Sequence, residues 1–304
     1  MNISDAMPES FEGQQAAPAA MAETRPMYWS VRRELWENRS IYIAPLTVGA
    51  VILVGFLLGS VHMAHRMREA ALLGPEEQKA AIMEPYEFAA GLLMAAAMIV
   101  GFFYSLEALH GERRDRSILF WKSLPVSDLT TVLAKASMIA ILQLITCAVI
   151  VATQWVMLLL NSAMLGGSGI SVSTLWSDVS WFQLSLGMLY HLVTVHILWH
   201  APLYAYLLLV SSWARRAAIL WAGLPVLAVG VVEKIAFGSS HFANMLLYRL
   251  TGPEEFNLSQ RSFHPMAGTN LVHFLSTPGL WAGLLVTAAF LVLAARVRRY
   301  RDPM

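Results

Sequence analysis

Three histidines in one apolar stretch are the residues whose spacing could most readily support chemistry. His191, His196 and His200 lie within residues 181–210, and positions 196 and 200 share a helical face, as two metal ligands would. With 16 methionines in the chain, the chemistry to consider is a copper or haem site. A bis-histidine haem needs ligands from a facing helix, and no other apolar run carries a histidine pair. We therefore favour histidines hydrogen-bonded to neighbouring helices, and a metal or haem site is the minor alternative.

Familiar catalytic motifs are missing from the sequence. No GxxxxGK[ST] pattern occurs, so the chain does not bind ATP through a P-loop. No HExxH pattern occurs either, because His110 is followed by Gly111 and Glu112 without a second histidine at the required place. The GGSG at residues 166–169 has no nearby base and is typical of a flexible linker. We expect no catalytic residue, no metal site and no cofactor in this chain.

Glu233 and Lys234 are adjacent charges in an apolar run, residues 217–237. At depth in a bilayer each would cost a few kcal/mol unless it faced a cavity or a partner. A charge near the outer surface can instead reach water with its side chain. The pair is either part of a transport path or a surface feature, and the sequence leaves both interpretations open.

The stretch 107–135 combines charges with large apolar side chains between two long apolar runs. Its basic residues are Arg113, Arg114, Arg116 and Lys122, and its apolar cluster is Ile118, Leu119, Phe120, Trp121 and Leu124. A loop that only joins two helices rarely needs both. The pattern predicts a short helix on the membrane face or a segment that docks into another protein.

Composition places all of these residues in a membrane protein. Of 304 residues, 57% are hydrophobic and 13% charged, against about 25% charged in a soluble domain. Apolar runs of about 20 residues, enough to cross about 30 Å of hydrocarbon, recur along the chain. We predict an all-α polytopic membrane protein with six transmembrane helices. Their expected ranges are 41–61, 86–109, 131–160, 181–210, 217–237 and 279–295.

The segments outside these runs complete the predicted layout. Residues 1–26 are polar and are expected to be a disordered tail, and residues 27–300 form one transmembrane domain. Residues 27–40 predict an amphipathic interfacial helix anchored by Trp and Arg, with a solvated cytosolic helix as the alternative. Residues 110–130 form a cytoplasmic loop, and 239–278 an extracytoplasmic segment with short apolar patches. The single cysteine, Cys147, excludes a disulfide within the chain.

Basic residues fix the expected orientation. Fifteen of the 21 fall at the N-terminus, in two loops and in the C-terminal tail, and five fall in the opposite loops. The first group is Arg25, Arg32, Arg33, Arg39, Arg113, Arg114, Arg116, Lys122, Lys135, Arg215, Arg216, Arg296, Arg298, Arg299 and Arg301. The second is Arg66, Arg68, Lys79, Arg249 and Arg261. This bias predicts that both termini are cytoplasmic.

The layout and one segment resemble a known family. An interfacial N-terminal helix, six spans and the sequence ERRDRSILFWKSLPVSDLTTVLAK, from Glu112 to Lys135, are similar to an ABC-2 type transporter permease. This is the membrane subunit of a bacterial ABC exporter, located in the inner (plasma) membrane. The likeness in layout covers about residues 27–300, and the local segment is shared by subfamilies that transport different substrates.

The resemblance implies specific partners and sites. The permease would dimerise with a second copy or a paralogue and bind a separate ABC ATPase, which carries ATP and Mg²⁺; no nucleic-acid partner is expected. The loop after the second span would couple to the ATPase, with the apolar pair Trp121 and Leu124 mattering more than any one arginine. Its docking residues would be Glu112, Arg113, Arg114, Asp115, Arg116, Ser117, Phe120, Trp121, Leu124 and Pro125. Glu233 and Lys234 would belong to the transport path. The alternatives are a membrane-anchored recruitment or assembly protein and, less favoured, an intramembrane metal or haem protein.

Overall fold

The computed structural model describes residues 25–62, 74–123, 126–167, 180–252 and 271–300, together with residues 65, 69, 72 and 176. All regular secondary structure in this part of the chain is helical, and six of its helices are long and apolar enough to cross a membrane. The predicted all-α class and six apolar spans are confirmed. The tail predicted for residues 1–26 lies almost wholly outside the described residues, as do residues 253–270 of the 239–278 segment.

The predicted spans coincide with observed helices to within a few residues at most ends. The fourth span is divided into α9, a π-helix at Leu192–Trp199, and α10. The helices are α1 (Pro26–Glu37), α2 (Ser40–Gly59), α4 (Pro75–Glu107), α5 (His110–Arg114), α6 (Ile118–Lys122), α7 (Asp128–Gly167), α9 (Trp181–His191), α10 (Ala201–Trp213), α11 (Ala218–Phe237), α12 (His241–Thr251), α13 (Leu271–Ser276) and α14 (Pro278–Tyr300).

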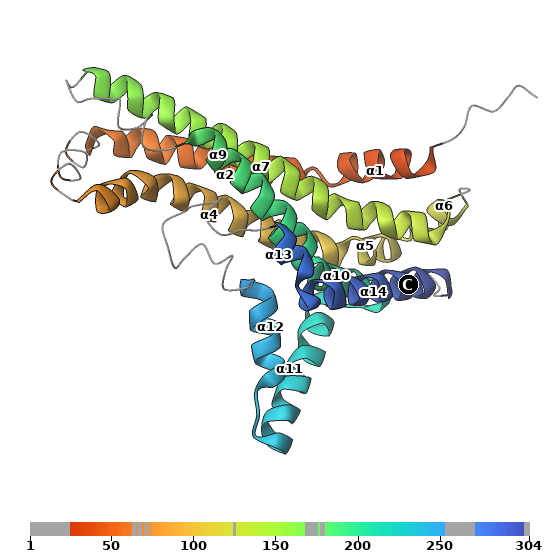
Figure 1. The fold of residues 1–304 in the computed structure, drawn as a ribbon. Coiled ribbons are helices and arrows are strands. Elements are labelled where there is room, and N and C mark those ends of the chain that lie inside the picture. Colours follow the sequence, from red (N-terminus) through yellow and green to blue (C-terminus); the bar gives the residue numbers. More distant parts are fainter. Residues whose placement is uncertain are drawn as a thin grey trace, which may run out of the picture.

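The spans form a bundle with two distinct ends. Helices α2, α4 and α7 pack along one another, and α10 packs on α14 and α4 (Figure 1). Helix α1 lies along the first part of α7, near the end of the bundle that also holds α5, α6 and the C-terminal end of α14 (Figure 1). The segments predicted to be cytoplasmic therefore gather at one end, which we call the loop end.

Close packing of α2 on α7 depends on one glycine. A Cβ atom at Gly49 would lie 2.9 Å from the Val149 side chain and 3.2 Å from that of Thr153, so only glycine lets the two backbones approach this closely. Gly55 and Gly59, a GxxxG pair on the same helix, have no neighbouring atom at that position. The small-residue motif is therefore not what packs α2 within the chain.

Helices α11 and α12 leave the bundle as a hairpin that runs across the direction of α4 and α7 (Figure 1). Of the 20 residues of α11, only Ala218 and Ala222 are buried. Exposed apolar side chains run along the rest of the helix, including Leu224, Leu227 and Ile235. Such a surface is stable only against lipid or another protein.

The break in the fourth span has a local cause. Proline at position 202 has no backbone N–H, and in a regular α-helix its ring would crowd the carbonyl of residue 198, which favours a break near this point. The turns before it widen into the π-helix Leu192–Trp199, and α10 begins at Ala201. Widened turns of this kind are often found at functional sites.

Candidate functional site

A buried carboxylate on α1 anchors that helix to the bundle. Glu34 is almost fully buried, and its Oε1 lies 2.8 Å from Lys135 Nζ on α7 and 2.6 Å from Arg33. Its Oε2 accepts a hydrogen bond from the Tyr104 hydroxyl of α4 at 3.1 Å. Three helices therefore meet at one side chain.

A second buried carboxylate, Glu112, connects the predicted coupling loop to three helices. Its Oε1 lies 3.1 Å from Lys135 and 3.2 Å from Arg33, and its Oε2 accepts a hydrogen bond from Arg298 of α14 at 3.0 Å. Arg298 also contacts Asp128, at the start of α7, at 3.1 Å. We call these residues the charge network: Arg33, Glu34, Glu112, Asp128, Lys135 and Arg298.

The charge network is electrically balanced, with three carboxylates facing three cations. Burial alone would raise the pKa of Glu34, but the Lys135 ammonium and the Arg33 guanidinium outweigh it and hold this pKa below its ordinary value. Burial similarly opposes the charge of Arg33, yet its contacts with Glu34, Glu37 and Glu112 raise its pKa. Because each charge is compensated by the others, removing one leaves a buried charge unpaired.

Helix α5 is also fastened to the loop between α10 and α11. Arg113, which is buried, donates hydrogen bonds to the carbonyl oxygens of Ser211 and Ala214. The Ser211 hydroxyl accepts bonds from the backbone N–H groups of Leu109 and His110, each at 2.9 Å. Two loops that are about 100 residues apart in sequence therefore behave as one piece of structure.

Helix α6 presents an apolar surface to the outside. Leu119 and Phe120 have exposed fractions of 58% and 60%, whereas Ile118 is buried. Between α5 and α6 the backbone of Arg116 takes a positive φ of 57°, a conformation that side-chain-bearing residues adopt only at a cost. This turn separates the buried helix α5 from the exposed face of α6.

The predicted docking residues divide into two groups. Arg114, Asp115, Arg116 and Phe120 are exposed, but Glu112 and Arg113 are buried and offer no surface to a partner in this conformation. Trp121 lies with its ring 3.8 Å from the Arg33 guanidinium, and Ser117 donates to the Glu112 carbonyl oxygen. The Trp121 ring thus packs against α1 and is half-buried, and its docking role stays a prediction. Leu124 and Pro125 lie outside the described residues.

Glu233 and Lys234 have local partners. The Glu233 carboxylate accepts hydrogen bonds from the N–H groups of His241 and Phe242, the first two residues of α12, and from the Ser239 hydroxyl. It thus caps α12 by satisfying N–H groups that have no partner within the helix. Lys234 donates to the Gly238 carbonyl oxygen in the same turn and is exposed. These contacts join α11 to α12.

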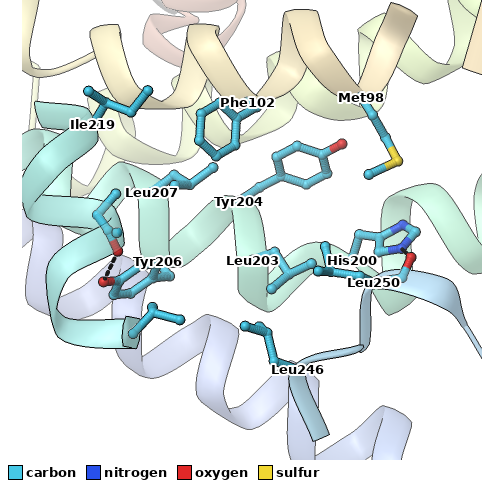
Figure 2. Close-up of a pocket in the computed structure, with 13 residues that line it drawn as sticks. Met98, Phe102, His200, Leu203, Tyr204, Tyr206, Leu207, Ile219, Leu246 and Leu250 are labelled. Atoms are coloured by element: carbon cyan, nitrogen blue, oxygen red, sulfur yellow. Dashed lines mark hydrogen bonds between the residues drawn. The ribbon is translucent and has the colours of Figure 1, made fainter. Parts of the chain in front are cut away.

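A pocket lies elsewhere on α11, between that helix, α4, α10 and α12 (Figure 2). Its volume is about 290 Å³. Phe102 and Met98 enter from α4, Tyr204 stands between them, and Leu246 enters from α12 (Figure 2). The charged pair predicted for the transport path does not line this pocket, whereas earlier turns of the same helix do.

The three histidine rings follow one another along the kinked fourth span in edge-to-face contact. The ring centroids of His191 and His196 are 5.6 Å apart, and those of His196 and His200 are 5.3 Å apart. His200 Nε2–H donates to the Leu250 carbonyl oxygen of α12 at 3.1 Å, as expected for a histidine that fastens two helices. Across the described residues, no three His, Cys, Asp or Glu side chains converge in a way that could hold a metal ion.

Comparisons with protein-family models, curated proteins and solved structures give no match for this chain. The candidate site is therefore inferred from the contacts in the structure alone. The sequence-based interpretation emphasised the α5–α6 segment but did not consider Glu34. It used Arg298 only as a marker of orientation, and Lys135 as such a marker and as the end of the family-like segment. The signal was present, because Glu34 lies between Val31 and Leu35 on the apolar face of α1 and Lys135 lies inside an apolar run.

Proposed function

We propose that this chain is the permease subunit of an ATP-driven exporter, moved by a separate ABC ATPase that docks on α6. The observation that carries the proposal is the two-sided character of α5–α6. One side, at Glu112 and Arg113, is tied into the bundle, and the other exposes Leu119 and Phe120. An element built this way can receive a push from a partner and pass it to the spans.

The charge network gives this transmission a physical route. When ATP closes the partner dimer, a displacement of α5 moves Glu112, and with it the side chains of Lys135 on α7 and Arg298 on α14. Arg113 carries the same movement to the end of α10. The proposed permease then switches between two arrangements of its spans, each favoured by a different nucleotide state of the partner.

The proposal includes an orientation and an assembly. The loop end faces the cytoplasm, as the distribution of basic residues indicates, and α1 lies at the inner membrane surface with Tyr28, Trp29 and Trp36 exposed. A second copy or a paralogue completes the transport path.

The docking element is tested by truncating its exposed side chains. The variant Leu119→Ala with Phe120→Ala should retain the fold, because both side chains are exposed. It should lose ATPase binding by about thirtyfold, since truncating an interface hot spot costs about 2 kcal/mol. The measurement is co-purification of a P-loop ATPase with the tagged chain, together with its stimulated ATP hydrolysis. Phe182→Ala, with an exposed fraction of 74% at the start of α9, is the matched control.

Two outcomes would favour other functions. An ATPase-free chain that recruits a cytosolic protein through α6 would be an anchoring or assembly protein. A stoichiometric metal or haem in the purified chain, lost in His196→Ala, would point to the intramembrane metal protein instead. If the α6 variant binds and stimulates the ATPase normally, α6 is not the docking element, and the loop with Arg215 and Arg216 becomes the next candidate.

A further inference from the structure

The pocket between α4, α10, α11 and α12 has walls suited to a hydrocarbon. None of its thirteen lining residues is Asp, Glu, Lys or Arg. Met98 and Phe102 form one wall, Leu207 another, and Val226 and Leu246 come from the α11–α12 hairpin. A sugar, a peptide or an ion would leave its polar groups without partners here, which is costly in an apolar site.

Most polar groups in the walls are already used, and among the described residues the two exceptions are His200 Nδ1, a buried ring nitrogen without a hydrogen-bond partner, and the Tyr204 hydroxyl. Tyr206 donates its hydroxyl hydrogen to the Ala222 carbonyl oxygen at 2.8 Å, and His200 donates to that of Leu250. Both bonds fasten the hairpin to α10 or its start. Within the part of the chain that the structure describes, the Tyr204 hydroxyl has no hydrogen-bond partner, and it stands between Met98 and Phe102 (Figure 2).

The surroundings of the pocket are apolar as well. Ile99 and Phe103 follow the lining residues of α4 and are exposed, and Leu220 and Leu224 do the same on α11. Both helices are long and apolar enough to cross a membrane. A molecule that reaches the pocket from this side comes from the hydrocarbon phase, not from water.

We propose that this pocket binds an acyl chain of a bilayer phospholipid, with the headgroup remaining outside the pocket. Apolar walls without a charge, an approach through apolar surface and a single free hydroxyl together select this ligand. The binding is a property of the chain by itself. In the proposed exporter, the bound lipid would also be the exported molecule, and this role rests on the proposed function.

Glycines on α11 provide a matched pair of test variants. Gly223 lines the pocket, and a Cβ atom there would meet no atom within 4 Å, so a larger side chain can start from this wall without a clash at Cβ. We use Gly223→Phe to fill pocket volume from this position. Gly230 lies two turns further along the helix, is equally unobstructed and does not line the pocket. Gly230→Phe therefore controls for the effect of a new aromatic side chain on α11.

The purified chain, alone in vesicles, is labelled with a phosphatidylethanolamine that carries a photoactivatable diazirine in one acyl chain. Labelling should map to Met98, Phe102 or Leu207 and fall about tenfold in Gly223→Phe, because the filled volume excludes the chain. Gly230→Phe should label like the unmodified protein. A diazirine fatty acid serves as the second probe, and preferential labelling by it would contradict the choice of a phospholipid.

Several results would overturn the proposal. Uniform labelling of all exposed apolar side chains, with none in the pocket, would show only the annular lipid. If Gly223→Phe leaves the lipid labelling unchanged but abolishes the proposed association of two copies, a second copy and not a lipid fills the pocket. The map on the unmodified chain decides the question even if a variant fails to fold. Binding of the ATPase through α6 is assayed on the same variants. If the ATPase binds but the lipid does not label the pocket, the lipid proposal fails while the proposed function stands.

Discussion

The charge network shows what a single buried carboxylate does in this chain. Glu34 is held by Lys135, Arg33 and Tyr104, so it decides where α1 sits on the bundle. Amphipathic patterning predicted an interfacial helix over residues 27–40, but it did not predict the ion pair. An ion pair between positions about 100 residues apart depends on how α1 lies against α7, and helical periodicity carries no information on that.

The Glu34–Lys135 pair should show strong coupling. We expect Glu34→Gln and Lys135→Met each to destabilise the protein by about 3 kcal/mol, because each leaves a buried charge without its partner. The double variant should lose clearly less than the sum of the two, which denaturant titration in detergent can measure. The exposed pair Arg114–Asp115 is the control, and its coupling should be much weaker because solvent screens both charges. Additive losses at Glu34 and Lys135 would contradict the coupling.

The same carboxylate predicts a dependence on pH. Its native pKa is lower than the ordinary value of 4.5, so ionised Glu34 adds stability that is fully present above pH 4.5. This contribution disappears as the pH falls below 4.5 and through the lowered native pKa. Stability measured between pH 6 and pH 3 should therefore decline less steeply in Glu34→Gln than in the unmodified protein. Parallel curves would show that other carboxylates dominate the acid response.

At the scale of elements, turns and helix breaks carry much of the functional geometry. The sequence predicted a short helix or a docking segment in the 107–135 stretch, and the structure has two short helices there, α5 and α6, separated by the positive φ of Arg116. The loop after α10 contains a second such residue, Ala217, with φ of 48°. Neither is glycine, so the usual sequence signal for this backbone conformation is missing.

Ala217 therefore predicts a stabilising substitution. Ala217→Gly removes the cost of a Cβ atom in the left-handed conformation and should raise the free energy of unfolding by about 0.5–1 kcal/mol. Ala236→Gly, in the regular and exposed part of α11, should lower it by a similar amount, because glycine is a poor helix former. Opposite signs in the same denaturant titration support the strained loop. A loss in both variants would mean that the loop conformation is not strained.

At the scale of the whole molecule, hydrophobicity predicted more than any motif did. The positions of all six candidate spans were predicted from runs of apolar residues. A helix that crosses a bilayer must have about 20 mostly apolar residues, and this requirement is visible in the sequence. The π-helix was missed because a proline such as that at 202 does not by itself signal one, since Pro45, Pro85 and Pro225 lie inside α-helices that continue. The projecting hairpin α11–α12 was missed because a helix with apolar residues on all sides does not reveal which neighbour it faces.

The gathering of α1, α5–α6 and the end of α14 at one end of the bundle makes topology the decisive test of the whole arrangement (Figure 1). Gly74, exposed at the start of α4, lies at the opposite end, and Arg215 lies in the loop fastened to α5. In a chain with Cys147→Ala, an impermeant thiol reagent applied from outside should label Gly74→Cys but not Arg215→Cys. Permeabilised cells, in which both should react, provide the control. The reverse pattern would place α6 outside the cell, where no ATP-driven partner could reach it, and would rule out the proposed function.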